Sequence, residues 1–231
     1  MAIDLPNLGQ TALVRRQLQV VLALDCSGSM TGDKIASLNY AMRAAIPEMR
    51  AAAADNPETD LMVRVLRFAS GAQWHVPDPT LVDDLEWTDL AAGGETHMGE
   101  ALCAIADILN PEYMPGRQLP PVIVLVSDGQ PSDDFDMGMK RLLAAPYGQR
   151  SLRVAVAIGG DADIEILERF IAHPDFKPLR ANNAQDLVNR IKWATTVPVK
   201  SVSQSTNAPD PLTVLARDAE RQKKTASDVV W

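Results

Sequence analysis

The stretch that decides the fold is VVLALDCSGSM, residues 20–30. Five apolar residues run directly into Asp25, and Ser27 and Ser29 then stand on either side of Gly28. A strand that ends in a carboxylate and two hydroxyls is typical of three kinds of site: a catalytic elbow, a phosphate-binding loop or a metal site. The rest of the sequence has to distinguish among them.

Composition limits the classes of partner. The chain has 231 residues, of which 46% are hydrophobic, which is enough for one sizeable core and one or at most two domains. Lys and Arg number 22 against 30 Asp and Glu, so the formal net charge is -8. This balance disfavours nucleic acid and anionic membranes, because both attract clustered cations. With two cysteines and no apolar run near the ~18 residues of a membrane span, we expect a cytoplasmic protein.

Four apolar runs rich in β-branched residues are predicted to be strands: 18–25, 61–69, 121–128 and 152–160. The first, third and fourth are almost continuously apolar, which is typical of parallel strands covered on both faces. A further run, 72–79, carries two prolines at its end and predicts a short antiparallel edge strand beside the second run.

Amphipathic helical periods alternate with these strands, at 35–49, 98–109, 135–142, 164–171 and 187–194. Such alternation predicts a doubly wound, mostly parallel α/β sheet of the Rossmann-like kind. We expect a single domain over residues 12–196. The chain becomes polar and proline-bearing after Trp193, so 197–231 is expected to be a linker and tail, with a short helix at 212–224 as an alternative for part of it.

Three segments bring oxygen atoms to one edge of the predicted sheet. The first strand ends with Asp25, Ser27 and Ser29, the third apolar run ends with Asp128, and a glycine-rich turn precedes Thr96. Functional groups of doubly wound folds gather at the carboxyl ends of the strands. An all-oxygen cluster suits a hard cation such as Mg²⁺, so these five residues are the candidate metal site.

This pattern resembles a known family. The sequence D-x-S-x-S at 25–29, a Thr after a glycine-rich turn and Asp128 in SDG resemble the metal-ion-dependent adhesion site of von Willebrand factor A domains, in the same order across residues 15–196. More narrowly, DGQPSDD (128–134) and IKWAT (191–195) look like the TerY-type proteins of bacterial tellurite-resistance gene clusters.

The resemblance implies a role for each site residue. Ser27, Ser29 and Thr96 would bind Mg²⁺, or alternatively Mn²⁺ or Ca²⁺, directly or nearly so, and Asp25 and Asp128 would act largely through water and hydrogen bonds. An Asp or Glu of a partner protein would complete the coordination. The resemblance therefore implies a metal-dependent protein-interaction module and no enzyme, in a bacterial stress-response or signalling assembly with a kinase and a PP2C-like phosphatase.

Other interpretations of the same residues stay open. The motif at 25–29 could be a polar turn that only caps the next helix. The sequence lacks the G-x-S-x-G elbow, the phosphate loop GxxxxGK[ST] and a GxGxxG after the first strand. The remaining enzymatic alternative is a Mg²⁺-dependent phosphotransfer enzyme or phosphatase that uses Asp25 as its nucleophile and Asp128 as a second carboxylate.

Overall fold

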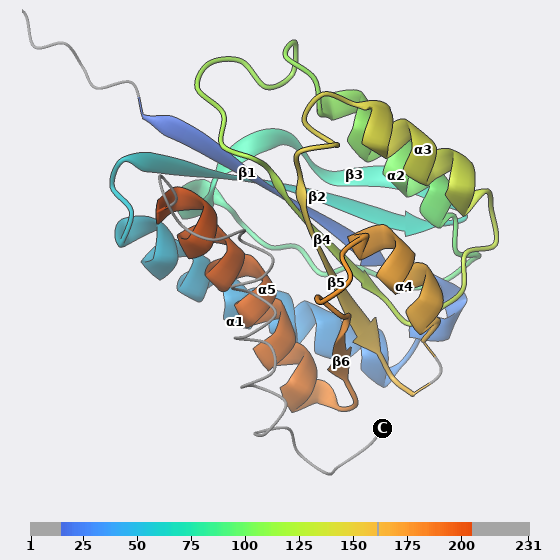
Figure 1. Ribbon diagram of the computed structural model, residues 1–231. Helices are drawn as coiled ribbons and strands as arrows, with labels where there is room; N and C mark the ends of the chain where they lie inside the picture. The colour runs from blue at the N-terminus through green and yellow to red at the C-terminus, as the bar shows by residue number, and fades with distance from the viewer. Residues whose placement is uncertain (1–14, 161, 205–231) are drawn as a thin grey trace, which may run out of the picture.

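A central sheet organises the computed structural model, which describes residues 15–160 and 162–204. The sheet has 6 strands in the order β3-β2-β1-β4-β5-β6, with helices packed on both faces (Figure 1). Neighbouring strands are parallel except for β2 and β3, so the expected doubly wound α/β fold is confirmed. The strands are β1 (Arg16–Asp25), β2 (Thr59–Ala69), β3 (Gly71–Leu81), β4 (Val122–Ser127), β5 (Leu152–Ile158) and β6 (Leu179–Ala181).

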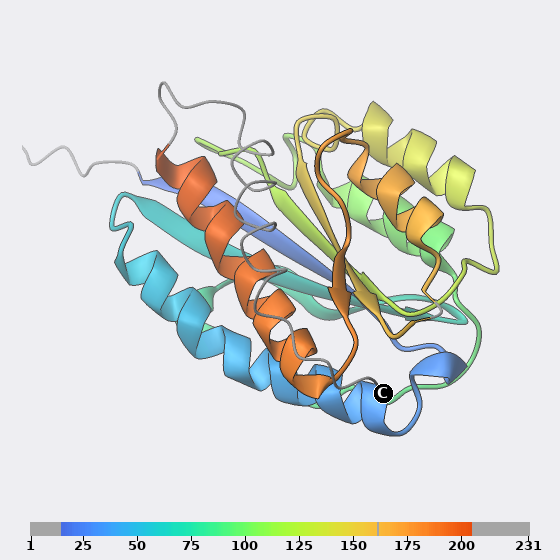
Figure 2. The same cartoon turned by 60° about the horizontal axis from the view of Figure 1, so that its bottom comes forward.

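The helices form two layers. Two of them, α1 and α5, lie side by side on one face of the sheet, and α2, α3 and α4 cover the other (Figures 1 and 2). Each predicted amphipathic period corresponds to one of these helices, and only the period at 98–109 extends past its helix, by one residue. They are α1 (Asp33–Ala54), α2 (Met98–Ile108), α3 (Phe135–Ala144), α4 (Ile164–Ile171) and α5 (Ala184–Gln204), with short 3₁₀ turns η1 (Gly28–Met30) and η2 (Val82–Asp84).

The two central strands are buried on both faces. Every residue of β1 from Leu18 to Asp25 is buried, as is every residue of β4. This explains their unbroken apolar sequences, because neither strand has a side that meets water. The chain leaves β1 toward β2 on one side and returns to pair β4 on the other, so the strand order reverses between β1 and β4. In such sheets this reversal marks the place where ligands bind.

The edges of the sheet differ from the sequence-based expectation. The antiparallel edge strand exists, but it is not short, because β3 runs over 11 residues from Gly71 to Leu81. Its prolines are tolerated because an edge strand leaves one row of N–H groups unpaired. At the opposite edge, β6 was not predicted at all. Its 3 residues are too few to show a hydrophobic period.

The chain continues as a helix past the domain boundary expected at residue 196. Helix α5 continues to Gln204 and contains Pro198. Within this segment Val199 is 1% exposed, and Lys200 forms an ion pair with Asp55 at the end of α1. Packing against α1 thus outweighs the weak periodicity and the proline that suggested a linker. Residues 205–231, including the alternative helix at 212–224, lie outside the described residues.

Helices α2 and α3 approach each other closely at two glycines. A Cβ atom built on Gly99 would lie 2.2 Å from the carbonyl oxygen of Asp134, and one built on Gly138 would lie 2.5 Å from the carbonyl oxygen of Gly99. These contacts are to backbone atoms, which cannot rotate away. The glycines therefore hold the start of α2 against the start of α3, the two segments that follow Thr96 and Asp128 in the sequence.

We predict that Gly99→Ala destabilises the fold by about 1–3 kcal/mol, the usual range for overpacking. The matched control is Gly160→Ala, since a Cβ there meets no atom within 4 Å, and it should change stability by less than about 0.5 kcal/mol. Equilibrium urea unfolding measures both. Equal effects of the two substitutions would show that the close approach of α2 and α3 does not constrain the fold.

Candidate metal centre

The carboxylate of Asp25 stands at the end of β1 and is fully buried. Its Oδ1 accepts a hydrogen bond from the backbone N–H of Ser27 at 2.9 Å, and its Oδ2 accepts one from the hydroxyl of Ser127 at 2.6 Å. Because Ser127 ends β4, this carboxylate ties together the two strands at the reversal point. Burial raises the pKa of Asp25 above its ordinary value, which the two hydrogen bonds partly offset and the nearby charge of Asp128 reinforces.

A chain of hydrogen bonds links the next three polar side chains. The Ser29 hydroxyl donates to Asp128 Oδ1 at 2.7 Å, and the Ser27 and Ser29 hydroxyl oxygens are 3.0 Å apart. A hydroxyl has one proton, so Ser29 accepts in the second contact and Ser27 donates. The Ser27 proton thus points to Ser29 and the Ser29 proton to Asp128, so each hydroxyl oxygen keeps a lone pair for a cation. The second oxygen of Asp128 accepts from the Lys34 ammonium at 2.5 Å.

Backbone contacts hold the loop that carries Thr96 against this segment. The N–H of Gly28 donates to the carbonyl of Gly94 at 2.9 Å, and the N–H of Gly93 donates to the carbonyl of Cys26 at 2.8 Å. Gly94 has φ +91°, and a Cβ there would lie 2.6 Å from the Ser70 hydroxyl, so this turn requires glycine. The glycine-rich sequence therefore brings Thr96 to the end of β1.

A second set of contacts joins Thr96 to the loop after β4. The N–H of Thr96 donates to the Ser132 hydroxyl at 3.0 Å, and the N–H of Ser132 donates to the carbonyl of Thr96 at 2.9 Å. Next to it, the carboxylate of Asp133 accepts from the N–H groups of Gly99 and Glu100 at the start of α2. The three loops thus form one hydrogen-bonded unit.

Oxygens from two of the loops converge on one point beside the third loop, at Gly129. A Cβ built on Gly129 would lie 3.6 Å from Thr96 Oγ1, 3.7 Å from Ser29 Oγ and 3.9 Å from Asp25 Oδ2. Gly129 has no side chain, so this space is bounded by oxygen atoms. The structure therefore brings the predicted site residues from three separate segments to one place, at the carboxyl ends of β1 and β4.

The chemistry of this space suits a hard cation. Cys26 lies within the motif, but it belongs to the hydrophobic core, and burial raises the pKa of its thiol to about 12. Within residues 15–160 and 162–204, no group of three or more His, Cys, Asp or Glu side chains is placed to hold a metal ion. Any cation at this point would thus depend on hydroxyls together with the two carboxylates, a donor set that fits Mg²⁺ and related ions.

The sequence-based prediction missed four residues that shape the site: Lys34, Ser127, Ser132 and Asp133. Ser127 and Ser132 flank the predicted ligand in the segment SDGQPS, but a serine in a turn has many possible partners. In the acidic run after Pro131, Asp133 binds the start of α2, whereas Asp134 caps α3.

Among the residues that the structure describes, none of the helices combines the length and the apolar character that crossing a bilayer requires.

We predict that the buried charge of Asp25 makes the metal-free protein less stable as pH rises. A carboxyl with a raised folded-state pKa contributes stability that is full below the unfolded-state pKa and is lost as pH rises through the folded-state pKa. In EDTA, the difference in free energy of unfolding between Asp25→Asn and wild type should therefore shift in favour of the variant between acidic and neutral pH. Urea unfolding across this range measures it, and a difference that is independent of pH would contradict the prediction.

Known proteins share this fold to different extents. A search for relatives among curated proteins found no match. Among solved structures, a von Willebrand factor type A protein from Catenulispora acidiphila has a TM-score of 0.62 at 17% identity, covering 80% of this chain and 43% of that one. The ArnB paralog VWA2 from Sulfolobus acidocaldarius has a TM-score of 0.56 at 14% identity, covering 76% and 44%.

A third similar structure is that of proximal thread matrix protein 1 from the mussel byssus, described with a zinc-occupied MIDAS motif. Its TM-score is 0.57 at 13% identity, covering 81% of this chain and 46% of that one. At such identities the likeness shows the fold alone, and the chain spans less than half the length of these three structures. The family model for the von Willebrand factor type A domain matches residues 19–190, most of the chain. The chain therefore belongs to the von Willebrand factor type A domain family.

Proposed function

We propose that this chain is a metal-dependent protein-interaction module. Five residues hold a divalent cation, and the cation binds an acidic side chain of a partner protein. The observation that carries the proposal is the convergence of Thr96, Ser29 and Asp25 oxygens on the space beside Gly129, where each lies 3.6–3.9 Å from one point. The residues of the site are Asp25, Ser27, Ser29, Thr96 and Asp128.

The donor set supports an exchangeable Mg²⁺ ion, with Mn²⁺ or Ca²⁺ as alternatives. Ser27, Ser29 and Thr96 would hold the ion, and Asp25 and Asp128 would orient the hydroxyls and supply negative charge. When bound, the cation supplies a positive charge that can attract a carboxylate. The zinc-occupied MIDAS motif of the mussel byssus protein supports the view that this fold accommodates divalent cations in that motif.

Because the chain is acidic overall, the binding of an acidic partner depends on the cation. A net charge of -8 repels an approaching acidic surface. A divalent cation at the site reverses this repulsion locally, so the contact forms only when the metal is present. This dependence gives the interaction both its specificity and a means of control.

The enzymatic alternative is disfavoured by the position of Asp25. A nucleophilic carboxylate needs an oxygen that can reach a substrate. Here the side chain is buried, and both of its oxygens accept hydrogen bonds, from the Ser27 N–H and the Ser127 hydroxyl. The carboxylate is thus positioned to organise the loop, and von Willebrand factor A domains are in general interaction modules.

Two short segments support a cellular setting for the interaction. The likeness of residues 128–134 and 191–195 to TerY-type proteins supports a bacterial, cytoplasmic role in a stress-response or signalling assembly. A kinase and a PP2C-like phosphatase are the proposed members of this assembly. Their identity rests on those two sequence segments.

We predict that Thr96→Ala and EDTA release the same partner from the protein. The backbone N–H and carbonyl of Thr96 still bind Ser132 in the variant, so only one cation-facing oxygen is lost. Capture of partners from the native host in Mg²⁺, quantified by mass spectrometry, should fall about tenfold or more in either case, as expected when a metal site loses a supporting group.

Thr80→Ala is the matched control, because Thr80 lies on the edge strand β3 and its hydroxyl donates to the nearby carbonyl of Asp78. It should capture partners as the wild type does. Partners that stay bound at full strength in EDTA and on Thr96→Ala would show that the interaction uses another surface.

A further inference from the structure

One cation already lies within hydrogen-bonding reach of the candidate metal centre. The Lys34 ammonium donates to Asp128 Oδ2 at 2.5 Å, while Asp128 Oδ1 accepts from the Ser29 hydroxyl at 2.7 Å. One carboxylate is thus shared between the oxygen cluster and a fixed positive charge. The Asp128 side chain is 0% exposed and that of Lys34 is 21% exposed, so water screens their interaction poorly.

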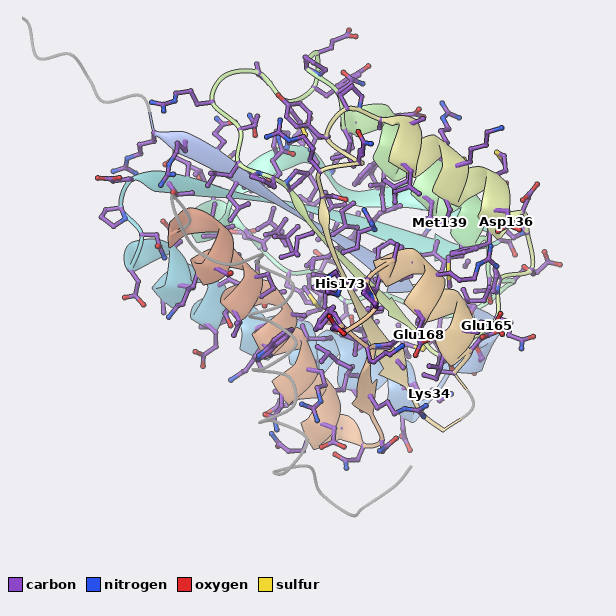
Figure 3. All side chains as sticks on the ribbon, in the orientation of Figure 1. Lys34, Asp136, Met139, Glu165, Glu168 and His173 are labelled. Carbon is purple, nitrogen blue, oxygen red and sulfur yellow. The ribbon has the colours of Figure 1, made fainter. Side chains whose placement is uncertain are left out.

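The fold fixes the position of Lys34. The chain turns at Gly32, which has φ +79°, and α1 begins at the next residue, so Lys34 lies in the first turn of that helix. Leu38 and Met42, one and two turns further along, are fully buried and hold α1 against the sheet. Figure 3 shows Lys34 on the side of the molecule where the parallel strands end. The lysine is therefore delivered to Asp128 by a packed helix.

We propose that Lys34 weakens the binding of the divalent cation and makes the loaded site select an anionic ligand. This inference rests on the proposed function, since it concerns the same cation and the same partner carboxylate. Lys34 touches Asp128 and acts on the cation through it, so it is a specificity-determining residue.

The charges at the site support this role. The carboxylates of Asp25 and Asp128 with the ammonium of Lys34 give the empty site one net negative charge. A divalent cation converts this to one net positive charge, which attracts a carboxylate. Without Lys34, the empty site would have two negative charges and would hold the cation more tightly. The loaded site would then be neutral and would attract a carboxylate less.

Two substitutions separate this charge effect from a structural role. Lys34→Gln keeps a hydrogen-bond donor toward Asp128 but removes the charge, and Lys34→Arg keeps the charge. Mn²⁺ affinity is measured by electron paramagnetic resonance of the free ion. We expect Lys34→Gln to bind Mn²⁺ roughly tenfold or more tightly than wild type, because charge interactions at poorly screened positions are strong, and Lys34→Arg to resemble wild type.

The second measurement uses acetate as the probe for a partner carboxylate. Acetate that binds the loaded site displaces water from Mn²⁺ and lowers the water-proton relaxation rate. We expect Lys34→Gln, saturated with Mn²⁺, to need more acetate than wild type for the same loss of relaxation. If Lys34 had a merely structural role, Lys34→Gln would weaken both Mn²⁺ binding and acetate binding. The charge role instead predicts tighter Mn²⁺ binding and weaker acetate binding.

The outcomes are distinct. Suppose that wild type binds Mn²⁺. If Lys34→Gln then lacks the tighter Mn²⁺ binding or the weaker acetate binding, the inference about Lys34 is wrong and the proposed function stands. If Mn²⁺ binds to neither protein, the proposed function itself fails.

Should Lys34→Gln fold poorly by circular dichroism, the wild type provides the test by nitrogen-edited NMR. Addition of Mg²⁺ should then move the Lys34 ammonium signal and leave that of Lys200, which is paired with Asp55, unchanged. An unmoved Lys34 signal would overturn the inference.

Discussion

The structure of this site depends on one buried carboxylate. Asp25 ends the central strand β1 and accepts hydrogen bonds from the Ser27 N–H and from the hydroxyl of Ser127, the last residue of β4. These two bonds fix how the chain leaves β1 and how closely the two strands end together. Ser27 and Ser29 take their positions from the first bond, and Asp128, which follows Ser127, takes its position from the second. The site is therefore a consequence of how two parallel strands terminate.

The carboxylate of Asp25 lowers the stability of the metal-free fold but supplies charge for binding a cation. Burial raises its pKa, so its charged form destabilises the metal-free fold. A hydrophobic or amide side chain at this point would relieve that cost but would remove the negative charge that a cation requires. Lys34 offsets part of the charge at Asp128, whereas no lysine within the described part of the chain forms an ion pair with Asp25. We infer that the site retains an unfavourable buried charge because binding a cation compensates for it.

The fold and the residues that meet at the candidate site could be predicted because both leave local patterns. The continuous apolar runs of β1 and β4 indicate parallel buried strands, and D-x-S-x-S at 25–29 places three oxygen-bearing residues in one turn. The pairing of Lys34 with Asp128 could not be predicted, since it depends on how α1 packs. The helical course of 197–204 was missed for a similar reason: Val199 is buried by tertiary contact, while its sequence neighbours are polar and include Pro198. Both features depend on contacts between residues far apart in the sequence, which local sequence patterns do not reveal.

The central claim is that a divalent cation binds among hydroxyl oxygens from two loops, beside the loop that carries Asp128. The most direct test is a crystal structure of the protein grown with Mn²⁺, with diffraction data collected near the manganese absorption edge. The account predicts an anomalous peak in the space beside Gly129, within coordination distance of the Ser27, Ser29 and Thr96 hydroxyl oxygens, and no peak at this point in crystals grown with EDTA. A manganese peak elsewhere with this space empty, or one held only by carboxylates, would contradict it.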